Sequence, residues 1–223
     1  MCAATPGGFK PDALFLAANG LPVVDPTARI IGDPNPHHTW GVNGSLRLWK
    51  KLTVSTLFDG RVGGDMINGT RSATTAGGVH KDTEARSRTD GTFGVNYYTK
   101  IYPDVAGPGK GVVALSTPLQ WQTWFNGIGG DAGPGFQYVE NGTFVKWREI
   151  SASYNWTHAM FRKYSGFESV DIRIGGRNLV TWTDYTGYDP ESSESGAFNI
   201  TQGVERFTTP QTRSLFLSLG LNR

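Results

Sequence analysis

Five stretches of the chain alternate apolar and polar side chains with a period of two, which is typical of a β-strand with one apolar and one polar face. In the first stretch Trp40, Val42 and Leu46 fall on one face, while Asn43 and Arg47 fall on the other. No apolar run is long enough for a membrane-crossing helix, so strands would have to make any crossing. The five predicted strands are residues 40–49, 52–58, 143–156, 169–182 and 211–221.

The third stretch, residues 143–156, alternates regularly only if one of its residues is left out of the alternation. Val145 and Trp147 have one parity, whereas Ile150, Ala152, Tyr154 and Trp156 have the other. A β-bulge near residues 148–149 would return all six side chains to one face, and such bulges are common at barrel rims.

The connections between the predicted strands alternate between short and long. Lys50 and Lys51 predict a very tight turn, and residues 157–167 predict a moderate one. Residues 61–142 carry no sustained period over about eighty residues, far beyond an ordinary connection. A second long loop runs from Trp182 to Pro210. In an antiparallel sheet all the long loops then fall at one end, as in outer-membrane barrels, although a soluble sandwich shows the same alternation within its strands.

Composition excludes several classes of function. With 21 Lys and Arg against 19 Asp and Glu the formal charge is +2, and no basic stripe argues for nucleic acid. A single cysteine rules out an intramolecular disulfide framework and a cysteine-based zinc cage. His37 and His38 are adjacent and face opposite ways in an extended chain, so they form a poor metal-chelating pair. We expect no catalytic residue, no metal site and no cofactor, and the chain is not predicted to be an enzyme.

The acidic loop of residues 184–205 leaves a choice between calcium binding and solvated charge. It lacks the spacing of a dedicated calcium loop, so solvated charge is the favoured interpretation and calcium binding stays open. Asp189 and Glu191 could in principle be the carboxylate pair of a glycosidase. They lie two residues apart beside Pro190, with nothing in the sequence to raise either pKa, which disfavours that chemistry.

Residues 175–191, GGRNLVTWTDYTGYDPE, resemble a signature of the SusC/RagA family of TonB-dependent outer-membrane receptors. Three further segments resemble the same family in the order in which it has them. These segments are GDPNP at residues 32–36, LFDGRVGGD at 57–65 and ENGTFVKWREISASYNW at 140–156. The chain therefore resembles the C-terminal barrel portion of such a receptor.

The resemblance implies an all-β fold: five antiparallel strands of an incomplete transmembrane β-barrel, forming a curved open sheet with long extracellular loops. Residues 1–38 would be an extracellular-loop segment and residues 39–223 the barrel part, with a long loop at 61–142 whose role stays open. Five strands cannot close a barrel, so we expect a piece of a longer polypeptide.

The implied activity is import of oligosaccharides or peptides across the outer membrane of a Gram-negative cell. The implied partners are the remaining barrel and plug, a SusD-like lipoprotein, outer-membrane lipid, and the TonB complex through an N-terminal part outside this sequence.

Ligand contact is predicted for Trp182, Tyr185, Tyr188 and Asp189, which match the family signature. The alternative function is a soluble glycan-binding β-module that uses these aromatic rings as a stacking platform. The two hypotheses differ in where the apolar side chains of the sheet should lie. A barrel wall exposes them on its outer side, whereas a sandwich packs them between two sheets. The side chains predicted to face outward include Leu46, Leu48, Val54, Ile172, Leu217 and Leu219.

Overall fold

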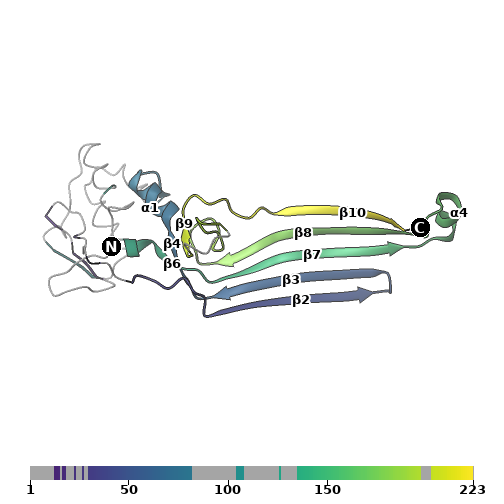
Figure 1. The fold of residues 1–223 in the computed structure, drawn as a ribbon, viewed down its shortest axis with the longest axis horizontal. Coiled ribbons are helices and arrows are strands. Elements are labelled where there is room, and N and C mark those ends of the chain that lie inside the picture. The colour runs from purple at the N-terminus through teal and green to yellow at the C-terminus, as the bar shows by residue number, and fades with distance from the viewer. Residues whose placement is uncertain are drawn as a thin grey trace. The chain divides into compact units, whose positions relative to one another are not determined.

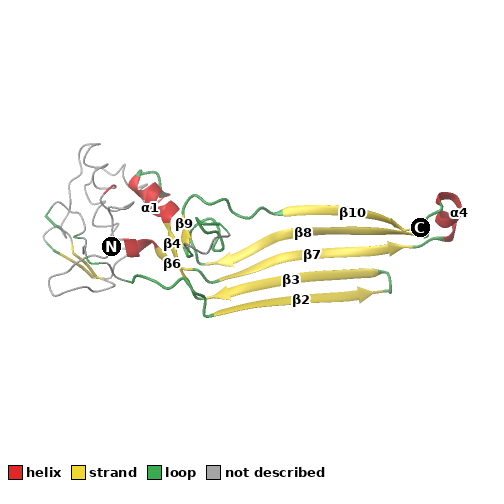
Figure 2. Ribbon diagram, viewed as in Figure 1, coloured by secondary structure: helices red, strands yellow, loops and turns green. Residues whose placement is uncertain are grey.

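The computed structural model describes residues 30–81, 135–196 and 202–222, with short pieces at 13–15, 17–18, 23, 27, 104–107 and 126. Its largest element is an antiparallel five-stranded sheet, drawn in yellow in Figure 2, whose strands follow the order β10-β8-β7-β3-β2. The strands are β2 (His38–Leu48), β3 (Leu52–Val62), β7 (Phe144–Trp156), β8 (Ser169–Thr183) and β10 (Ser214–Asn222). Each of these five strands pairs with the one that follows it along the chain within the set. Strands β10 and β2 lie at the two edges of the sheet (Figure 1). The predicted open sheet of five antiparallel strands is confirmed.

The register of strand pairing brings the apolar side chains of all five strands to one face of the sheet. Leu46 pairs with Val54, and Val54 pairs with Ala152; this cross-strand row continues through Ile174 to Leu217. These side chains are not packed against a second sheet, because Leu46, Ile174 and Leu217 are 61%, 61% and 66% exposed. An exposed apolar face contradicts a sandwich, in which the same residues would form the core.

The bulge predicted in the third strand is present. The register of β7 against β8 steps from Trp147 to Glu149 and leaves Arg148 out of the ladder. Against β3, Leu57 pairs with Glu149 and the next residue, Phe58, pairs with Trp147, so Arg148 is skipped on this side as well. In β8 the irregularity falls at Asn178, whose φ of +52° is a left-handed conformation that asparagine tolerates better than most residues. Its side-chain Nδ2 donates to the Thr212 carbonyl at 3.1 Å, so the Asn-Leu pair of the signature marks this distortion.

Two strand boundaries and one turn differ most from the prediction. Strand β3 continues beyond Phe58 to Val62, because Gly60 is a ladder residue and not a breaker. Strand β10 begins at Ser214, since Gln211 bonds to carboxylates of the preceding loop instead of to a strand. The turn at residues 157–167 contains a short helix, α4 (Ala159–Ser165). The tight turn at Lys50 is confirmed, with positive φ angles at Trp49 and Lys50.

A separate compact unit contains most of the long loop and is not irregular throughout. A small sheet orders β6 (Val139–Asn141), β4 (Asp65–Asn68) and β9 (Val204–Glu205) side by side. The other elements are α1 (Gly69–Ala76), the 3₁₀ helix η4 (Gly135–Tyr138), and the parallel pair β1 (Ala13–Phe15) and β5 (Asp104–Ala106). Asn68 caps α1 by accepting from the Arg71 backbone N–H at 2.8 Å. None of the described helices is both long and apolar enough to span a membrane.

Candidate functional site on the polar face of the sheet

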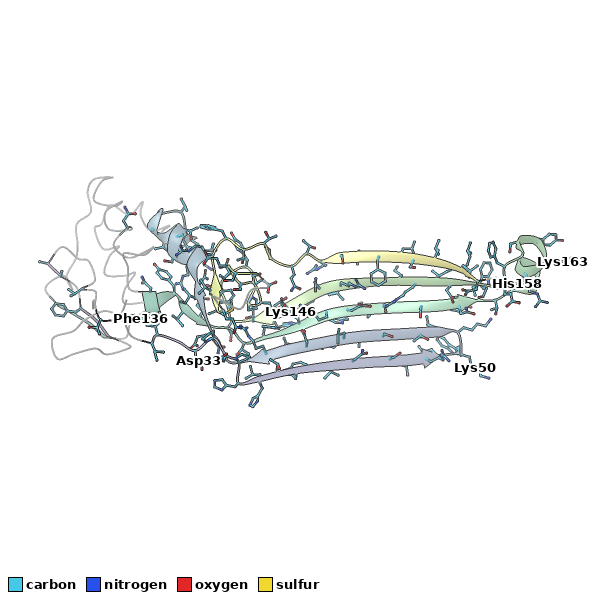
Figure 3. The ribbon with its side chains drawn as sticks, in the orientation of Figure 1. Asp33, Lys50, Phe136, Lys146, His158 and Lys163 are labelled. Carbon is cyan, nitrogen blue, oxygen red and sulfur yellow. The ribbon has the colours of Figure 1, made fainter. Side chains whose placement is uncertain are left out.

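The face of the sheet opposite the leucines carries an ionic cluster at one end. We use the name ionic cluster for Asp59, Arg61, Lys146, Arg148, Asp189, Glu191 and Gln211. Figure 3 labels Lys146 in this region, at the end of the sheet away from the hairpin turn of Lys50. Strands β3 and β7 supply the first four side chains, and the loops after β8 and before β10 supply the rest. The ionic cluster therefore joins two loops to the rim of the sheet.

Lys146 is the centre of the ionic cluster. Its side chain is only 3% exposed, and its Nζ lies 2.6 Å from Asp189 Oδ1 and 2.7 Å from Glu191 Oε2. The ammonium also lies 5.3 Å from the centre of the Phe144 ring. Since a buried charge is costly unless it is paired, the two carboxylates are needed to keep this ammonium inside the protein.

Both carboxylates are held in their charged form. Burial raises the pKa of Asp189, but hydrogen bonds from Lys146 Nζ and from the backbone N–H groups of Glu191 and Gln211 hold it below its ordinary value. The pKa of Glu191 is likewise lowered, because hydrogen bonds from Arg148 and Lys146 outweigh the effect of burial. Neither group has the raised pKa of a general acid, so the glycosidase hypothesis gains no support.

Arg148 is the bulge residue, and the bulge directs its guanidinium into the ionic cluster. Its Nε donates to both carboxylate oxygens of Asp59, at 2.9 and 2.8 Å, and its Nη2 pairs with Glu191. Arg61 donates to the carbonyl oxygens of Gly142 and Pro190, both at 3.1 Å. The Asp-Pro-Glu end of the signature is thus fastened to the sheet through both its side chains and its backbone.

The four predicted ligand-binding residues do not form one surface. Asp189 is buried in the ionic cluster, and Tyr185 is buried as well. The Tyr185 ring lies so close to Gly187 that a Cβ there would come within 2.4 Å of it. Tyr188 is exposed, whereas Trp182 is half-exposed and shares the apolar face of the sheet through its pairing with Val145.

The interpretation of the acidic loop as solvated charge is wrong for two of its members. Asp189 is buried as described above, and Glu205 is fully buried. Glu205 Oε1 accepts from Thr70 Oγ1 at 2.8 Å and from Thr208 Oγ1 at 3.2 Å. Among the described residues there is no group of three His, Cys, Asp or Glu side chains arranged to hold a metal ion.

Aromatic rings border the apolar face at both ends. Trp40 and Trp182 lie in one cross-strand row, joined through Gly60 and Val145. The Trp40 indole lies over Gly60, where a Cβ would come within 2.5 Å of it. Tyr154 and Trp156 lie near the opposite end of β7, and all four of these aromatic side chains are exposed. Exposed leucine and valine side chains fill the face between the two aromatic borders.

Sequence reasoning missed Lys146 and Arg148 as site residues. A signal was present in the parity of β7, because Lys146 falls on the polar face and the predicted bulge frees Arg148 from the alternation. Two of their carboxylate partners lie 43 to 45 residues further along the chain, and Asp59 lies 89 residues before Arg148, so the pairs could not be assigned without the fold.

Curated relatives of the chain are TonB-dependent receptors, although no family model matches it. TonB-dependent receptor P3 of Formosa agariphila is 27% identical over 200 residues, which cover 87% of this chain and 17% of the relative. TonB-dependent receptor P26 of the same organism is 26% identical over 202 residues, covering 87% of this chain and 18% of that receptor. The chain thus spans less than a fifth of the length of these relatives.

Solved structures with a similar fold belong to the RagAB peptide importer. In its open-open state the TM-score is 0.54 at 19% identity, covering 91% of this chain and 19% of the matched one. In its closed-closed state the TM-score is 0.52 at 20% identity, covering 86% and 18%. The resemblance to part of the barrel of a SusC/RagA-type TonB-dependent receptor, expected from the motifs, is confirmed.

Proposed function

We propose that this chain forms part of the wall of a TonB-dependent transporter in the outer membrane of a Gram-negative bacterium. The observation that carries the proposal is the exposed apolar face of the sheet between two aromatic borders. In β10 alone Leu215, Leu217 and Leu219 are 82%, 66% and 65% exposed. A regular row of exposed leucines costs free energy in water but is favoured against lipid, and aromatic girdles mark the two membrane interfaces.

The height of the apolar face supports the same proposal. From the row of Val145 and Trp182 to Trp156, strand β7 advances eleven residues, one of which is taken up by the bulge. Ten steps at about 3.4 Å give about 34 Å along the strand, and a barrel tilt of about 40° reduces this to about 26 Å. A lipid-facing band in outer-membrane barrels is about 25 Å tall.

The opposite face has the chemistry of a water-filled or plugged lumen. It carries hydroxyl, amide and charged side chains on every strand, including Asn43, Ser55, Ser153, Arg173 and Ser218. We therefore place the ionic cluster at the external rim, where it fastens the loop between β8 and β10. The polar face would line the route of the transported solute.

The cargo and partners of the transporter follow by analogy and are proposals. RagAB is a peptide importer, and its fold is the one that this sheet resembles. We propose energy-coupled import of oligosaccharides or peptides, with a SusD-like lipoprotein over the external loops and the TonB complex acting from the periplasm. Of the four predicted ligand-binding residues, Tyr188 is the one exposed outside the aromatic borders, so we place any solute contact there first.

Thiol labelling tests the membrane wall. In the receptor that contains this chain, Leu217→Cys and Leu219→Cys should resist a water-soluble maleimide in intact outer membranes, while Ser218→Cys should react, because the parity of β10 sends them to opposite faces. All three should react after unfolding. Equal labelling of all three positions in the membrane would contradict a lipid-facing wall and favour the soluble β-module.

Uptake assays test the transport itself. Disrupting the gene that encodes the receptor should abolish growth on an oligosaccharide or peptide mixture whose components are too large for porins. Reintroducing the gene should restore growth only in cells that have TonB and the co-expressed lipoprotein. Unimpaired growth with either one deleted would contradict the proposed energy coupling or the proposed lid. In the same assay, normal uptake by a Trp182→Ala/Tyr188→Ala receptor at normal surface abundance would rule out solute contact by these rings.

A further inference from the structure

The polar face carries a second group of charges, separate from the ionic cluster and built differently. Arg173 and Arg177 lie two residues on either side of Gly175 in β8. Phe216 of β10 pairs with Gly175, and Glu149 of β7 pairs with Arg177. We call this group the arginine patch. Serine residues occupy its other cross-strand positions, which are Ser151, Ser153, Ser214 and Ser218.

Gly175 gives the patch its shape. A Cβ at this position would lie 2.6 Å from the Phe216 ring and 2.6 Å from the Ile150 carbonyl oxygen, so only glycine leaves room for the ring against the backbone. The two guanidinium carbons then lie 5.5 Å (Arg173) and 5.3 Å (Arg177) from the centre of the Phe216 ring. Cation–π contact with one ring holds the two cations side by side despite their repulsion.

Glu149 shows that the spacing of the two cations suits a carboxylate. Its Oε1 accepts from Arg173 Nη2 at 2.9 Å, and its Oε2 accepts from Arg177 Nε at 3.2 Å. One carboxylate thus bridges both guanidinium groups, one oxygen to each. Two cations against one anion leave the patch with a net charge of +1.

The guanidinium groups keep donors available. Each has five N–H bonds, and the contacts above, with Ser151 Oγ at 3.2 Å from Arg173 Nη2, use only a minority of them within the described part of the chain. The side chains of Arg173 and Arg177 are 49% and 60% exposed. By contrast, Lys146 in the ionic cluster is buried and already paired with two carboxylates.

We propose that the arginine patch is a subsite for a carboxylate group of the transported solute, which gives the transporter a preference for acidic cargo. This inference rests on the proposed function, because it takes the polar face to line the route of the solute. A second carboxylate bridges the two guanidinium groups from the water side, as Glu149 does from the sheet, and neutralises the remaining charge. The Phe216 ring holds both guanidinium groups in position for it.

Peptide binding to the purified receptor that contains this chain tests the proposal, with tetraglutamate as the probe and tetraglutamine as its neutral match. Tetraglutamate should bind more tightly, and the difference should shrink as salt is added. Arg173→Gln/Arg177→Gln should weaken tetraglutamate binding about tenfold or more, since charge-assisted hydrogen bonds are lost. Binding of tetraglutamine should not change.

Arg47→Gln is the matched control, because it removes an exposed arginine from the polar face of β2, away from the patch. It should leave tetraglutamate binding unchanged. Arg173→Lys/Arg177→Lys keeps both charges without the planar guanidinium, so it should bind tetraglutamate less well than the wild type. Should the double glutamine variant fail to fold, Phe216→Leu keeps every charge and should still weaken binding.

Three outcomes would overturn the proposal: equal affinity for the two peptides, an equal loss in Arg47→Gln, or unchanged binding in both Phe216→Leu and the double variant. If Arg173→Gln/Arg177→Gln leaves tetraglutamate binding unchanged but makes the rest of the receptor more sensitive to proteolysis, the patch instead binds a carboxylate of the receptor itself. Thiol labelling and uptake are measured separately, so a failure of the subsite can be distinguished from a failure of the membrane wall.

Discussion

The two faces of the five-stranded sheet are built by different rules, although the same strands supply both. On the apolar face the leucines of β10 and Val42 and Leu46 of β2 are exposed in the described chain. On the polar face Lys146, Asp189 and Glu191 satisfy one another inside the chain. The polar face thus pairs its charges within the chain, whereas the apolar face leaves its side chains exposed.

The largest expected effect comes from removing the cation on which the polar face depends. Lys146→Met should lower the free energy of unfolding by about 3–5 kcal/mol, because the buried carboxylate of Asp189 loses its counter-ion and Glu191 keeps only Arg148. Denaturant titration of the detergent-solubilised receptor measures this loss. Lys50→Met, an exposed turn lysine, is the control and should change stability by less than about 0.5 kcal/mol.

A third variant separates charge from packing at the same place. Combining Lys146→Met with Asp189→Asn and Glu191→Gln removes the uncompensated charges, so it should recover part of the lost stability. If the triple variant is as unstable as Lys146→Met alone, packing of the lysine side chain and not ion pairing would explain the loss.

A charge placed on the apolar face tests the dependence of that face on lipid. Leu217→Arg should lower stability in lipid vesicles by about 2–4 kcal/mol, because its row lies in the middle part of the apolar band. Ser218→Arg places the same charge one residue away on the polar face and should cost far less. Similar losses for the two variants would mean that β10 does not separate lipid from water.

Close approach of backbone and ring makes Gly175 the next most sensitive position. Gly175→Ala should cost about 1–3 kcal/mol, since the added Cβ would overlap the Ile150 carbonyl oxygen and the Phe216 ring. At Gly220 of β10 an added Cβ would have its nearest contact at 3.5 Å, from Asp171 Cβ, so Gly220→Ala should be close to neutral. Differential scanning calorimetry of the two variants checks this difference; equal melting temperatures would show that Phe216 can move off Gly175 at no cost.

Acid titration should give the smallest effect on stability, and this effect should differ between the wild type and Lys146→Met. The pKa values of Asp189 and Glu191 are lowered in the folded state, so their contribution to stability is present above the unfolded pKa values and is lost as pH falls through the folded ones. The wild type should therefore lose stability in acid. In Lys146→Met the hydrogen bond that most lowers the pKa of Asp189 is lost while burial remains, so this pKa should rise and the loss of stability in acid should shrink. The same acid response in both proteins would exclude Lys146 as the cause of the shifts.

Which side chains share a face was decided by the sequence alone. Alternation in a strand is a property of the local backbone, so the apolar parity of Leu46, Val54, Ile172 and Leu217 could be read without any knowledge of neighbours. The bulge at Arg148 was predictable for the same reason, since one extra residue inverts every later parity. The resemblance of residues 175–191 to the SusC/RagA signature predicted the barrel. It did not distinguish the buried from the exposed residues of the signature.

Only the tertiary structure decided what the polar residues do. Asp189 and Tyr188 are neighbours in the signature, yet the first is buried against Lys146 and the second is exposed. The ion pairs of Lys146 form across more than forty residues, and they depend on strand register and on the path of the loop after β8. The need for glycine at position 175 follows only from the Phe216 ring that packs over it. Parity follows from adjacent peptide units, whereas ion pairing and ring packing follow from which strands become neighbours, and that information is not local.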